Sequence, residues 1–133
     1  MKVVLCHGVF DLFHVGHLEH LKQAREMGDH LLVSVVADRF CSKGKPIYDE
    51  NERLQLLWSL RCVSDVVLCS APGPEKIIED VKPDIYVRGT DYEGKEMPES
   101  ELLRRMGIQI LYTKSIPPRT GDIIARVLTE YGK

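Results

Sequence analysis

The sequence predicts an α/β domain in which helices cover both faces of a doubly wound, five-stranded parallel sheet. Short apolar runs alternate with stretches of helical periodicity along the whole chain. The runs are continuously apolar, which is typical of strands buried on both faces. Strands separated by helices run parallel, because each helical crossover returns the chain to the same end of the sheet. The 133 residues contain no linker, repeat or low-complexity segment, so one domain over 1–133 is expected.

The first two strands are predicted at Val3–Cys6 and Leu31–Ala37, which are both uninterrupted apolar runs. The helix between them is predicted over Gly16–Met27, where leucine and alanine recur at helical spacing and Gly28 follows as the terminating residue. Together these elements predict a βαβ unit at the start of the chain.

A second helix is predicted to begin after Asp49. Glu52 stands three positions later, and this pair has the pattern of a capping box, in which each side chain accepts a backbone N–H of the other residue. Leu54, Leu57 and Trp58 are expected to form the apolar stripe of this helix.

The second half of the chain continues the alternation. Strands are predicted at Val66–Cys69, Asp84–Arg88 and Ile108–Tyr112, and helices after the turn at 72–74, over Glu99–Met106 and around Ile123–Leu128. The polar stretch Gly89–Met97 is predicted to be a loop.

Ligands of doubly wound sheets bind beyond the carboxyl ends of the strands, where the strand order reverses. This rule predicts that the segments after the first, second, fourth and fifth strands face one crevice. These segments are Gly8–His17, Asp38–Tyr48, Gly89–Lys95 and Thr113–Gly121. They also carry most of the polar and charged side chains that could perform chemistry.

Composition excludes several other classes of protein. The net charge of −2 and the lack of a basic block argue against a nucleic-acid surface. No signal peptide and no apolar run near the ~18 residues of a membrane span are present, so a soluble, cytoplasmic protein without membrane contact is expected. Cys6, Cys41, Cys62 and Cys69 are widely spaced, which favours reduced thiols over a metal site or a disulfide framework.

The segment Gly8–His17 carries the strongest chemical signal. A glycine-bearing turn ends the first strand, and His14 and His17 flank Gly16 at the start of the next helix. A helix N-terminus presents unpaired N–H groups and partial positive charge, so it attracts phosphate. Imidazoles at this point can add donors, or positive charge, to a reacting phosphorus centre. The segment therefore indicates phosphate chemistry.

A metal site is the alternative interpretation of these histidines. His14, His17 and His20 are spaced to share one helix face, as the ligands of a metal-dependent hydrolase could be. The sequence has neither an H-E-x-x-H motif nor paired cysteines to complete such a site. We therefore expect no resident metal ligated by protein side chains.

The pattern Gly8-Val9-Phe10-Asp11-x-x-His14-x-Gly16-His17 resembles the H-x-G-H signature of the cytidylyltransferase-like nucleotidyltransferases. Within that superfamily the chain most resembles the short bacterial glycerol-3-phosphate cytidylyltransferases, and also related adenylyltransferase domains that act on sugar phosphates. The resemblance extends to the helix with Arg53 and to the G-x-D-Y/W-E-G-K element at Gly89–Lys95.

The resemblance implies an enzyme that transfers CMP from CTP, with Mg²⁺, to glycerol 3-phosphate or a similar small phosphorylated alcohol, and releases pyrophosphate. The acceptor phosphate is already anionic, so catalysis should rest on positioning and electrostatics rather than on a base. The same chemistry with ATP, on a sugar phosphate or flavin mononucleotide, is the first alternative, and a non-catalytic nucleotide sensor is the second. Relatives of this size commonly pair, so a homodimer is expected.

The resemblance also implies roles for individual residues. The residues expected to bind the nucleotide are Gly8, Val9, Phe10, Asp11, His14, Gly16, His17, Arg88, Gly89, Asp91, Arg119, Thr120 and Gly121. The residues expected to act in catalysis are His14, His17, Lys43, Lys45 and Arg119, and those expected to bind the acceptor are Lys43, Lys45 and Arg53. Arg88 could equally pair with a neighbouring carboxylate.

The last motif departs from the family pattern R-T-x-G-x-S-T-T, since this chain has Pro117-Pro118-Arg119-Thr120-Gly121-Asp122. One alignment matches Arg119-Thr120 to the family's R-T, and the other places Arg119–Gly121 where the S-T-T stands. Arg119 follows Tyr112 by seven positions, which favours the second alignment because the loop then keeps nearly its usual length. On that alignment Thr120 and the helix N-terminus bind the triphosphate, and Arg119 adds a charge.

Overall fold

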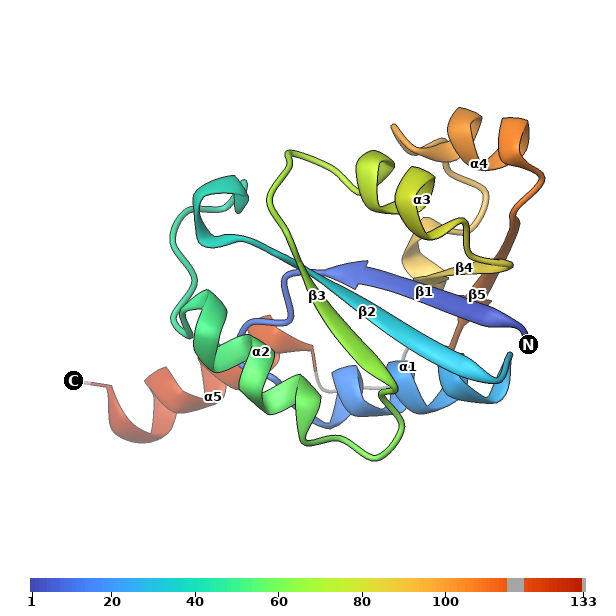
Figure 1. The fold of residues 1–133 in the computed structure, drawn as a ribbon. Helices are drawn as coiled ribbons and strands as arrows, with labels where there is room; N and C mark the ends of the chain where they lie inside the picture. The colour runs from blue at the N-terminus through green and yellow to red at the C-terminus, as the bar shows by residue number, and fades with distance from the viewer. Residues whose placement is uncertain (115–118, 133) are drawn as a thin grey trace.

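Five parallel strands form one sheet in the order β3-β2-β1-β4-β5, in the computed structural model that describes residues 1–114 and 119–132 (Figure 1). The strands are β1 Val3–Gly8, β2 His30–Val36, β3 Asp65–Cys69, β4 Ile85–Gly89 and β5 Gln109–Thr113. The helices are α1 Val15–Glu26, α2 Glu50–Trp58, α3 Glu75–Val81, α4 Ser100–Met106 and α5 Thr120–Tyr131, with short 3₁₀ helices η1 Asp38–Phe40 and η2 Thr90–Tyr92. The predicted doubly wound α/β fold is confirmed.

Two hydrophobic cores hold the layers together, one on each face of the sheet. Helices α1 and α2 cover one face and α3 and α4 the other (Figure 1). Strand β1 contributes Val4 and Cys6 to the first core and Leu5 to the second, as the two-residue period of a strand requires. Such burial contributes roughly 1.5–3 kcal/mol for each large apolar side chain, and it explains why the strands read as unbroken apolar runs.

The strand order reverses beside β1. The chain passes outward from β1 through β2 to β3, and then returns across the sheet to β4, which pairs with the other edge of β1. The carboxyl ends of β1 and β4 are therefore neighbours at this switch point. Residues that follow either strand meet there, although 81 positions separate the ends at Gly8 and Gly89.

Helix ends follow the capping rules closely. Asp49 caps α2 by accepting the N–H of Glu52 at 2.9 Å, and Glu52 accepts the N–H of Asp49 at 3.1 Å. Helix α4 ends at Gly107, which adopts the left-handed conformation (φ 69°) that glycine reaches without steric cost. Among the described residues, no helix is both long and apolar enough to cross a membrane.

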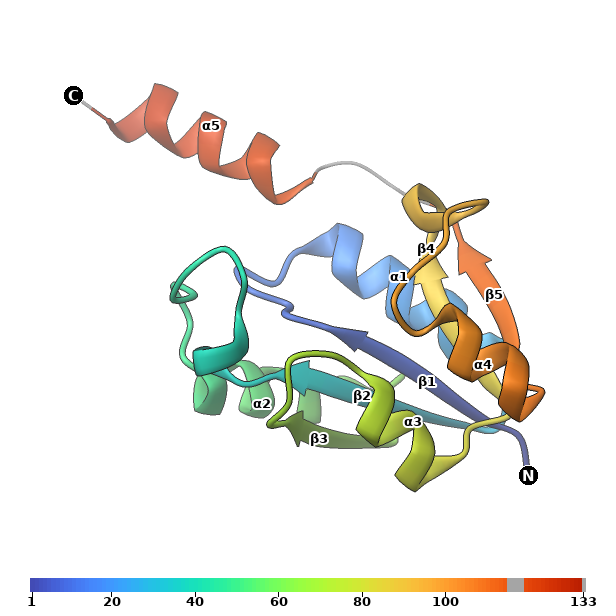
Figure 2. The same ribbon diagram turned by 90° about the horizontal axis from the view of Figure 1, so that it is seen from above.

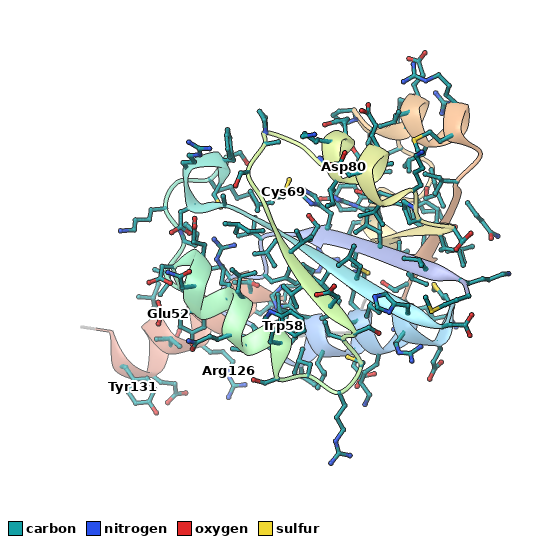
Figure 3. The ribbon with its side chains drawn as sticks, viewed as in Figure 1. Glu52, Trp58, Cys69, Asp80, Arg126 and Tyr131 are labelled. Carbon is teal, nitrogen blue, oxygen red and sulfur yellow. The ribbon has the colours of Figure 1, made fainter. Side chains whose placement is uncertain are left out.

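One expectation about an apolar side chain is wrong. Trp58, the last residue of α2 (Figure 3), does not belong to the buried stripe of the helix, because it is 54% exposed. Leu57 is buried and Leu54 packs against the first core, as expected, and Arg53 is buried four positions before Leu57. Trp58 lies about 100° further round the helix than Leu57. The four cysteines are free, as expected; Cys6 in β1 and Cys69 in β3 are buried, and Cys41 and Cys62 are half-buried.

Helix α5 is longer than the predicted segment around Ile123–Leu128 and stands apart from the layers. Its ribbon extends away from the sheet (Figure 2), and none of its residues is buried. Only its N-terminal end reaches the switch point. Leu128 and Tyr131, further along α5, are 64% and 82% exposed.

Candidate active site at the switch point

A cavity of about 360 Å³ opens at the carboxyl ends of β1, β4 and β5, and we call it the switch-point cavity. All residues expected to bind the nucleotide line it, except Asp11 and Gly121. They are Gly8, Val9, Phe10, His14, Gly16, His17, Arg88, Gly89, Asp91, Arg119 and Thr120. Lys114, which directly follows β5, adds another positive charge to the wall. The structure thus brings together the predicted segments after the first, fourth and fifth strands.

The turn between β1 and α1 has an unusual backbone. Phe10 (φ 56°) and Leu12 (φ 48°) both adopt the left-handed conformation, which costs roughly 1–2 kcal/mol for a residue with a side chain. The buried Phe10 ring holds this conformation by packing in the first core. A Cβ on Gly8 would lie 3.1 Å from that ring, so glycine here gives room to Phe10.

Asp11 braces the same turn from behind. Its carboxylate accepts the backbone N–H groups of Ile47 and Tyr48, both at 2.9 Å, and that of Leu12 at 3.0 Å. These bonds attach the first turn to the segment that leads into α2. The structure thus places Asp11, which was expected at the nucleotide, outside the lining of the cavity, with both carboxylate oxygens bonded to the backbone.

His14 and His17 cap the start of α1, and the cap fixes their tautomers. The Nδ1 atom of His14 accepts the N–H of Gly16 at 3.0 Å, and the Nδ1 atom of His17 accepts the N–H of His14 at 3.3 Å. A backbone N–H only donates, so both Nδ1 atoms must be unprotonated. Each neutral ring therefore carries its proton on Nε2.

The Nε2 atoms of this pair are hydrogen-bond donors at the cavity wall. His14 donates from Nε2 to Oγ1 of Thr120 at 3.0 Å, and this bond joins α1 to the start of α5. The ring of His17 lies 4.0 Å from that of His14, centroid to centroid. Burial lowers the pKa of His17 to about 4, with His14 and His20 adding to the effect, and burial also lowers the pKa of His14. Of the two expected contributions, donors and positive charge, the geometry favours donors.

Two more histidines line the cavity, His7 and His20, and neither was among the expected site residues. The Nδ1 atom of His7 lies 3.0 Å from Oγ of Ser34, and that of His20 lies 2.6 Å from Oγ1 of Thr113. Burial, and then the charge of Arg88, lowers the pKa of each to about 4. The position of His7 at the carboxyl end of the first strand, just before Gly8, is the sequence signal that could have identified it.

Arg88 is held by buried groups behind the cavity. Its Nη1 atom donates to the Tyr86 hydroxyl at 3.4 Å and lies 3.9 Å from Oε2 of Glu99. The Tyr86 hydroxyl itself donates to Glu99 at 2.7 Å, and the guanidinium stacks on the Tyr92 ring at 4.0 Å. The sequence allowed a pairing of Arg88 with a neighbouring carboxylate without identifying it, and the structure shows that this carboxylate is Glu99. Beside these contacts, Arg88 lines the switch-point cavity.

Arg119 and Thr120 bring the start of α5 to the cavity. Arg119 pairs with Asp91 at 3.3 Å, and both side chains are largely exposed. Exposed pairs contribute only about 0–1 kcal/mol, so an arriving phosphate can displace Asp91 from Arg119. Gly121 lies one position further along α5 and does not line the cavity. Pro117 and Pro118 of the same motif lie outside the described residues.

Arg53, which was expected to bind the acceptor, lies in the interior of the fold and lines neither the switch-point cavity nor the cavity beside it. Its side chain is completely buried, and Nε donates to the carbonyl of Tyr48 at 3.0 Å. Nη1 donates to the carbonyls of Val9 and Val36, both at 2.8 Å, and Nη2 donates to Asp38 at 2.6 Å. Arg53 thus ties α2 to the ends of β1 and β2, and its donors are used for the fold.

The segment after β2 faces a second cavity, of about 520 Å³, which we call the neighbouring cavity. Ser42 lines it, opposite the segment before α3 and the segment before α4. Lys43 and Lys45 follow Ser42 in an exposed loop and line neither cavity. No residue of Asp38–Tyr48 lines the switch-point cavity, so the expectation that all four segments face one crevice is wrong for this segment, which borders the neighbouring cavity through Ser42.

The histidine cluster does not have the geometry of a metal site. Within residues 1–114 and 119–132, no three His, Cys, Asp or Glu side chains converge so that they could hold a metal ion. His14 and His17 serve the helix cap, and His20 bonds to Thr113. The hydrolase alternative has no support in this part of the chain.

Comparison with known proteins agrees with this geometry. The family description "Cytidylyltransferase-like" matches residues 5–117. Bifunctional protein HldE of Citrifermentans bemidjiense is 36% identical over 98% of this chain, and that of Streptomyces coelicolor is 38% identical over 92%. The chain spans only 28% and 27% of the length of these relatives. The expected similarity to glycerol-3-phosphate cytidylyltransferases is thus replaced by similarity to HldE proteins.

Solved structures show the same relationship. A lipopolysaccharide core biosynthesis protein of Thermoplasma volcanium superposes with a TM-score of 0.72 and 33% identity, over 90% of this chain and 99% of that one. Pantothenate synthetase of Thermus thermophilus shares the fold alone, with a TM-score of 0.63, 14% identity, and coverage of 89% of this chain and 57% of that one. With the H-x-G-H histidines at the switch point of the sheet, the chain belongs to the cytidylyltransferase-like family of nucleotidyltransferases.

Proposed function

We propose that this chain transfers an adenylyl group from ATP to a phosphorylated sugar and releases pyrophosphate. One observation carries the proposal above all others. The switch-point cavity gathers neutral imidazole donors, the N-terminus of α5 and the cationic Arg119 and Lys114, and it lies next to a second cavity that contains hydroxyl and carboxylate groups. The first cavity suits a triphosphate, and the second suits a polyol.

In the proposed reaction, an oxygen of the acceptor phosphate attacks the α-phosphorus of ATP. A new phosphorus–oxygen bond forms, and the bond from the α-phosphorus to the bridging oxygen breaks, so pyrophosphate leaves with the electron pair. No proton has to be removed, because the attacking oxygen is already anionic. The barrier lies in bringing two anions together and in the charge that develops on the α-phosphoryl oxygens.

His14 and His17 are proposed to stabilise that charge as donors. The capping bonds hold both rings with Nε2–H outward, so no reorganisation is required as charge develops. The N-terminal N–H groups of the 12-residue helix α5 and the guanidinium of Arg119 add to the field at the leaving pyrophosphate. Arg119 would exchange Asp91 for a phosphate oxygen, which frees Asp91 to accept from the nucleoside.

The neighbouring cavity is proposed to bind the acceptor. Ser42, Glu75 and Glu99 offer oxygens to sugar hydroxyls, and Arg88 offers the positive charge for one phosphate. The two carboxylates would repel an acceptor with many negative charges, so a monophosphate fits better than a bisphosphate. Lys43 and Lys45, in the loop after Ser42, are proposed to approach the acceptor phosphate when the substrates bind.

The relatives favour a sugar and ATP over glycerol 3-phosphate and CTP. The curated relatives reported above are named HldE, and a similar structure is named for the biosynthesis of the lipopolysaccharide core, which is built from sugars. The sequence resemblance to adenylyltransferase domains that act on sugar phosphates points the same way. The neighbouring cavity is also larger than a three-carbon phosphate requires.

Mg²⁺ is proposed to arrive on the triphosphate. Bound there, it would neutralise the phosphates and assist the departure of pyrophosphate. The part of the chain that the structure describes offers no cluster of three metal-binding side chains, so the phosphate oxygens would be its main ligands. The expected homodimer stays a prediction, since the structure contains one chain.

Release of pyrophosphate tests the proposal directly. ATP and CTP would each be mixed with Mg²⁺ and a panel that contains aldose phosphates, glycerol 3-phosphate and flavin mononucleotide. We expect ATP with an aldose phosphate to give a kcat/KM at least ~10-fold above every CTP reaction, a difference of ~1.4 kcal/mol. A preference for CTP with glycerol 3-phosphate would overturn the proposal. Tight ATP binding without pyrophosphate from any acceptor would favour the sensor instead.

A further inference from the structure

The switch-point cavity and the neighbouring cavity share part of their walls. Three residues line both cavities: His7, Arg88 and Tyr92. A group that borders both cavities stands where two ligands would meet, one from each side. In the proposed reaction the groups that meet are the α-phosphate of ATP and the phosphate of the acceptor.

His7 has one ring nitrogen available at this border. Its Nδ1 atom bonds to the buried hydroxyl of Ser34, and Nε2 makes no hydrogen bond within the described residues. No buried side-chain nitrogen or oxygen in those residues lacks a partner, so Nε2 must be open to a cavity. The ring therefore has a fixed anchor on one side and a free polar atom on the other.

The anchor of His7 leaves its protonation adjustable. The Ser34 hydroxyl can donate to Nδ1 or accept from it, because the hydroxyl hydrogen rotates. The bond between His7 and Ser34 can therefore form in two protonation states: the neutral ring with its proton on Nε2, where the hydroxyl donates, and the imidazolium, where the hydroxyl accepts. Charged or titratable groups from every surrounding element line the two cavities together with His7. They are Arg88 on β4, Asp91 and Tyr92 on η2, Glu99 before α4, Glu75 at the start of α3, His14, His17 and His20 at the start and in the first half of α1, Lys114 after β5 and Arg119 before α5.

We propose that His7 is a catalytic residue that binds the acceptor phosphate through Nε2 at the border of the two cavities, opposite Arg88. This proposal rests on the adenylyl transfer proposed above. His7 and Arg88 would hold the attacking oxygen in line with the α-phosphorus, so both the affinity for the acceptor and the rate of transfer depend on them. Because the ring can take up a proton, the arrival of a second anion would be accompanied by partial protonation of His7.

Two substitutions separate the role of Nε2 from that of Nδ1. The amide of Asn in His7→Asn can keep a bond to Ser34 but cannot reach the border, whereas the longer Gln in His7→Gln places an N–H near the former Nε2. We expect His7→Asn to lower kcat/KM for the acceptor by ~10²-fold, the scale of one preorganised donor, and His7→Gln to restore part of it. The Kd of ATP should stay within ~2-fold, since the effect falls on the acceptor.

His30→Gln is the matched control, because His30 begins β2 at the opposite end of the sheet and should leave all constants unchanged. Circular dichroism and thermal unfolding would show that the variants fold. Equal activity of His7→Asn and wild type would overturn the proposal, and so would a loss confined to ATP binding. If wild type turns over no sugar phosphate at all, the proposed function fails instead. Inorganic phosphate binding to the protein loaded with a non-hydrolysable ATP analogue would then still test His7, because His7→Asn should weaken it.

Discussion

Two pairs of histidines face the switch-point cavity, and they are anchored in different ways. The Nδ1 atoms of His14 and His17 accept backbone N–H groups, whereas those of His7 and His20 bond to hydroxyls. Burial lowers the pKa of His7, His17 and His20 to about 4 in each case, so the pKa alone does not separate the pairs. The anchors do separate them.

A backbone N–H cannot become an acceptor, so protonating His14 or His17 would break a bond of the helix cap. These two rings are fixed as neutral donors. A hydroxyl can reverse its role, so His7 and His20 can take a proton without losing a partner. His14 and His17 therefore provide a constant electrostatic field at the triphosphate, whereas His7 and His20 can change their protonation when a charged ligand binds.

The largest expected effect concerns the fixed pair. His17→Ala should lower kcat by ~10²–10³-fold, because the Nε2–H donor and the Nδ1 acceptor of the cap are lost together. His30→Ala, at the far end of the sheet, serves as the control and should retain wild-type turnover. Steady-state pyrophosphate release measures both. A folded His17→Ala protein with a near-normal rate would remove the fixed pair from the mechanism.

The second effect is the dependence of stability on pH. The pKa of His7 and of His20 is about 4 in the folded protein, below the ordinary value of 6.5, so the unfolded chain binds more protons between these values. The free energy of unfolding should therefore be fully retained above about pH 6.5 and fall as the pH drops toward 4. Each residue contributes at most ~1.4 kcal/mol per pH unit.

Urea titrations across this pH window measure the slope. The slope should decrease in His7→Gln and decrease further in the double variant with His20→Gln. A slope that is the same in wild type and in the double variant would show that these rings are not neutral in the folded protein.

A smaller effect is a difference in pH dependence between the two substrates, because the acceptor is proposed to contact His7 and the triphosphate is proposed to contact His14 and His17. Binding an acceptor dianion raises the pKa of His7, so the complex takes up protons and kcat/KM for the acceptor should rise as the pH falls from about 8 to about 6.5. The rise is at most ~10-fold per pH unit for one proton. The Kd of ATP should change little over the same range, because His14 and His17 stay neutral. If kcat/KM for the acceptor and the Kd of ATP changed with pH in the same way, the proposed difference between His7 and the pair His14 and His17 would be contradicted.

The smallest expected effect comes from the bond between His14 and α5. Thr120→Val removes the hydroxyl that accepts from Nε2 of His14 but keeps the size and the branching of the side chain. We expect kcat to fall by only ~2–10-fold, the scale of one ordinary hydrogen bond, because Nε2–H remains available to the phosphate. A loss as large as that of His17→Ala would mean that Thr120 itself binds the triphosphate, as the sequence alignment suggests.

The sequence predicted those parts of the site that depend on local pattern. Apolar runs located the strands, the alternation with helices implied the switch point, and the spacing of His14 and His17 placed both rings at one helix start. The contacts of Arg53 and Asp11 were not predictable in this way, because all but one partner of each residue lie far along the chain. These distant partners are 15–44 positions from Arg53 and 36–37 positions from Asp11. A buried arginine and a surface arginine look alike in sequence.

His7 and the neighbouring cavity show a second limit. The carboxyl end of β1 was expected to carry function, but which strand residue borders which cavity depends on how η1 and η2 turn the following segments. No periodicity encodes the direction of such turns. The same holds for Lys43 and Lys45, which line neither cavity although their loop follows β2, the strand paired with β1.

NMR of the protein labelled with ¹⁵N-histidine directly tests whether the helix cap fixes the tautomers of His14 and His17. Long-range ¹H–¹⁵N correlations near neutral pH, with and without ATP and Mg²⁺, report which ring nitrogen carries the proton. The structure predicts an unprotonated Nδ1 and a protonated Nε2 for both residues in both states. A proton on Nδ1 of His14 or His17, in the other tautomer or in the imidazolium, would show that the helix cap does not hold the two rings as neutral Nε2–H donors.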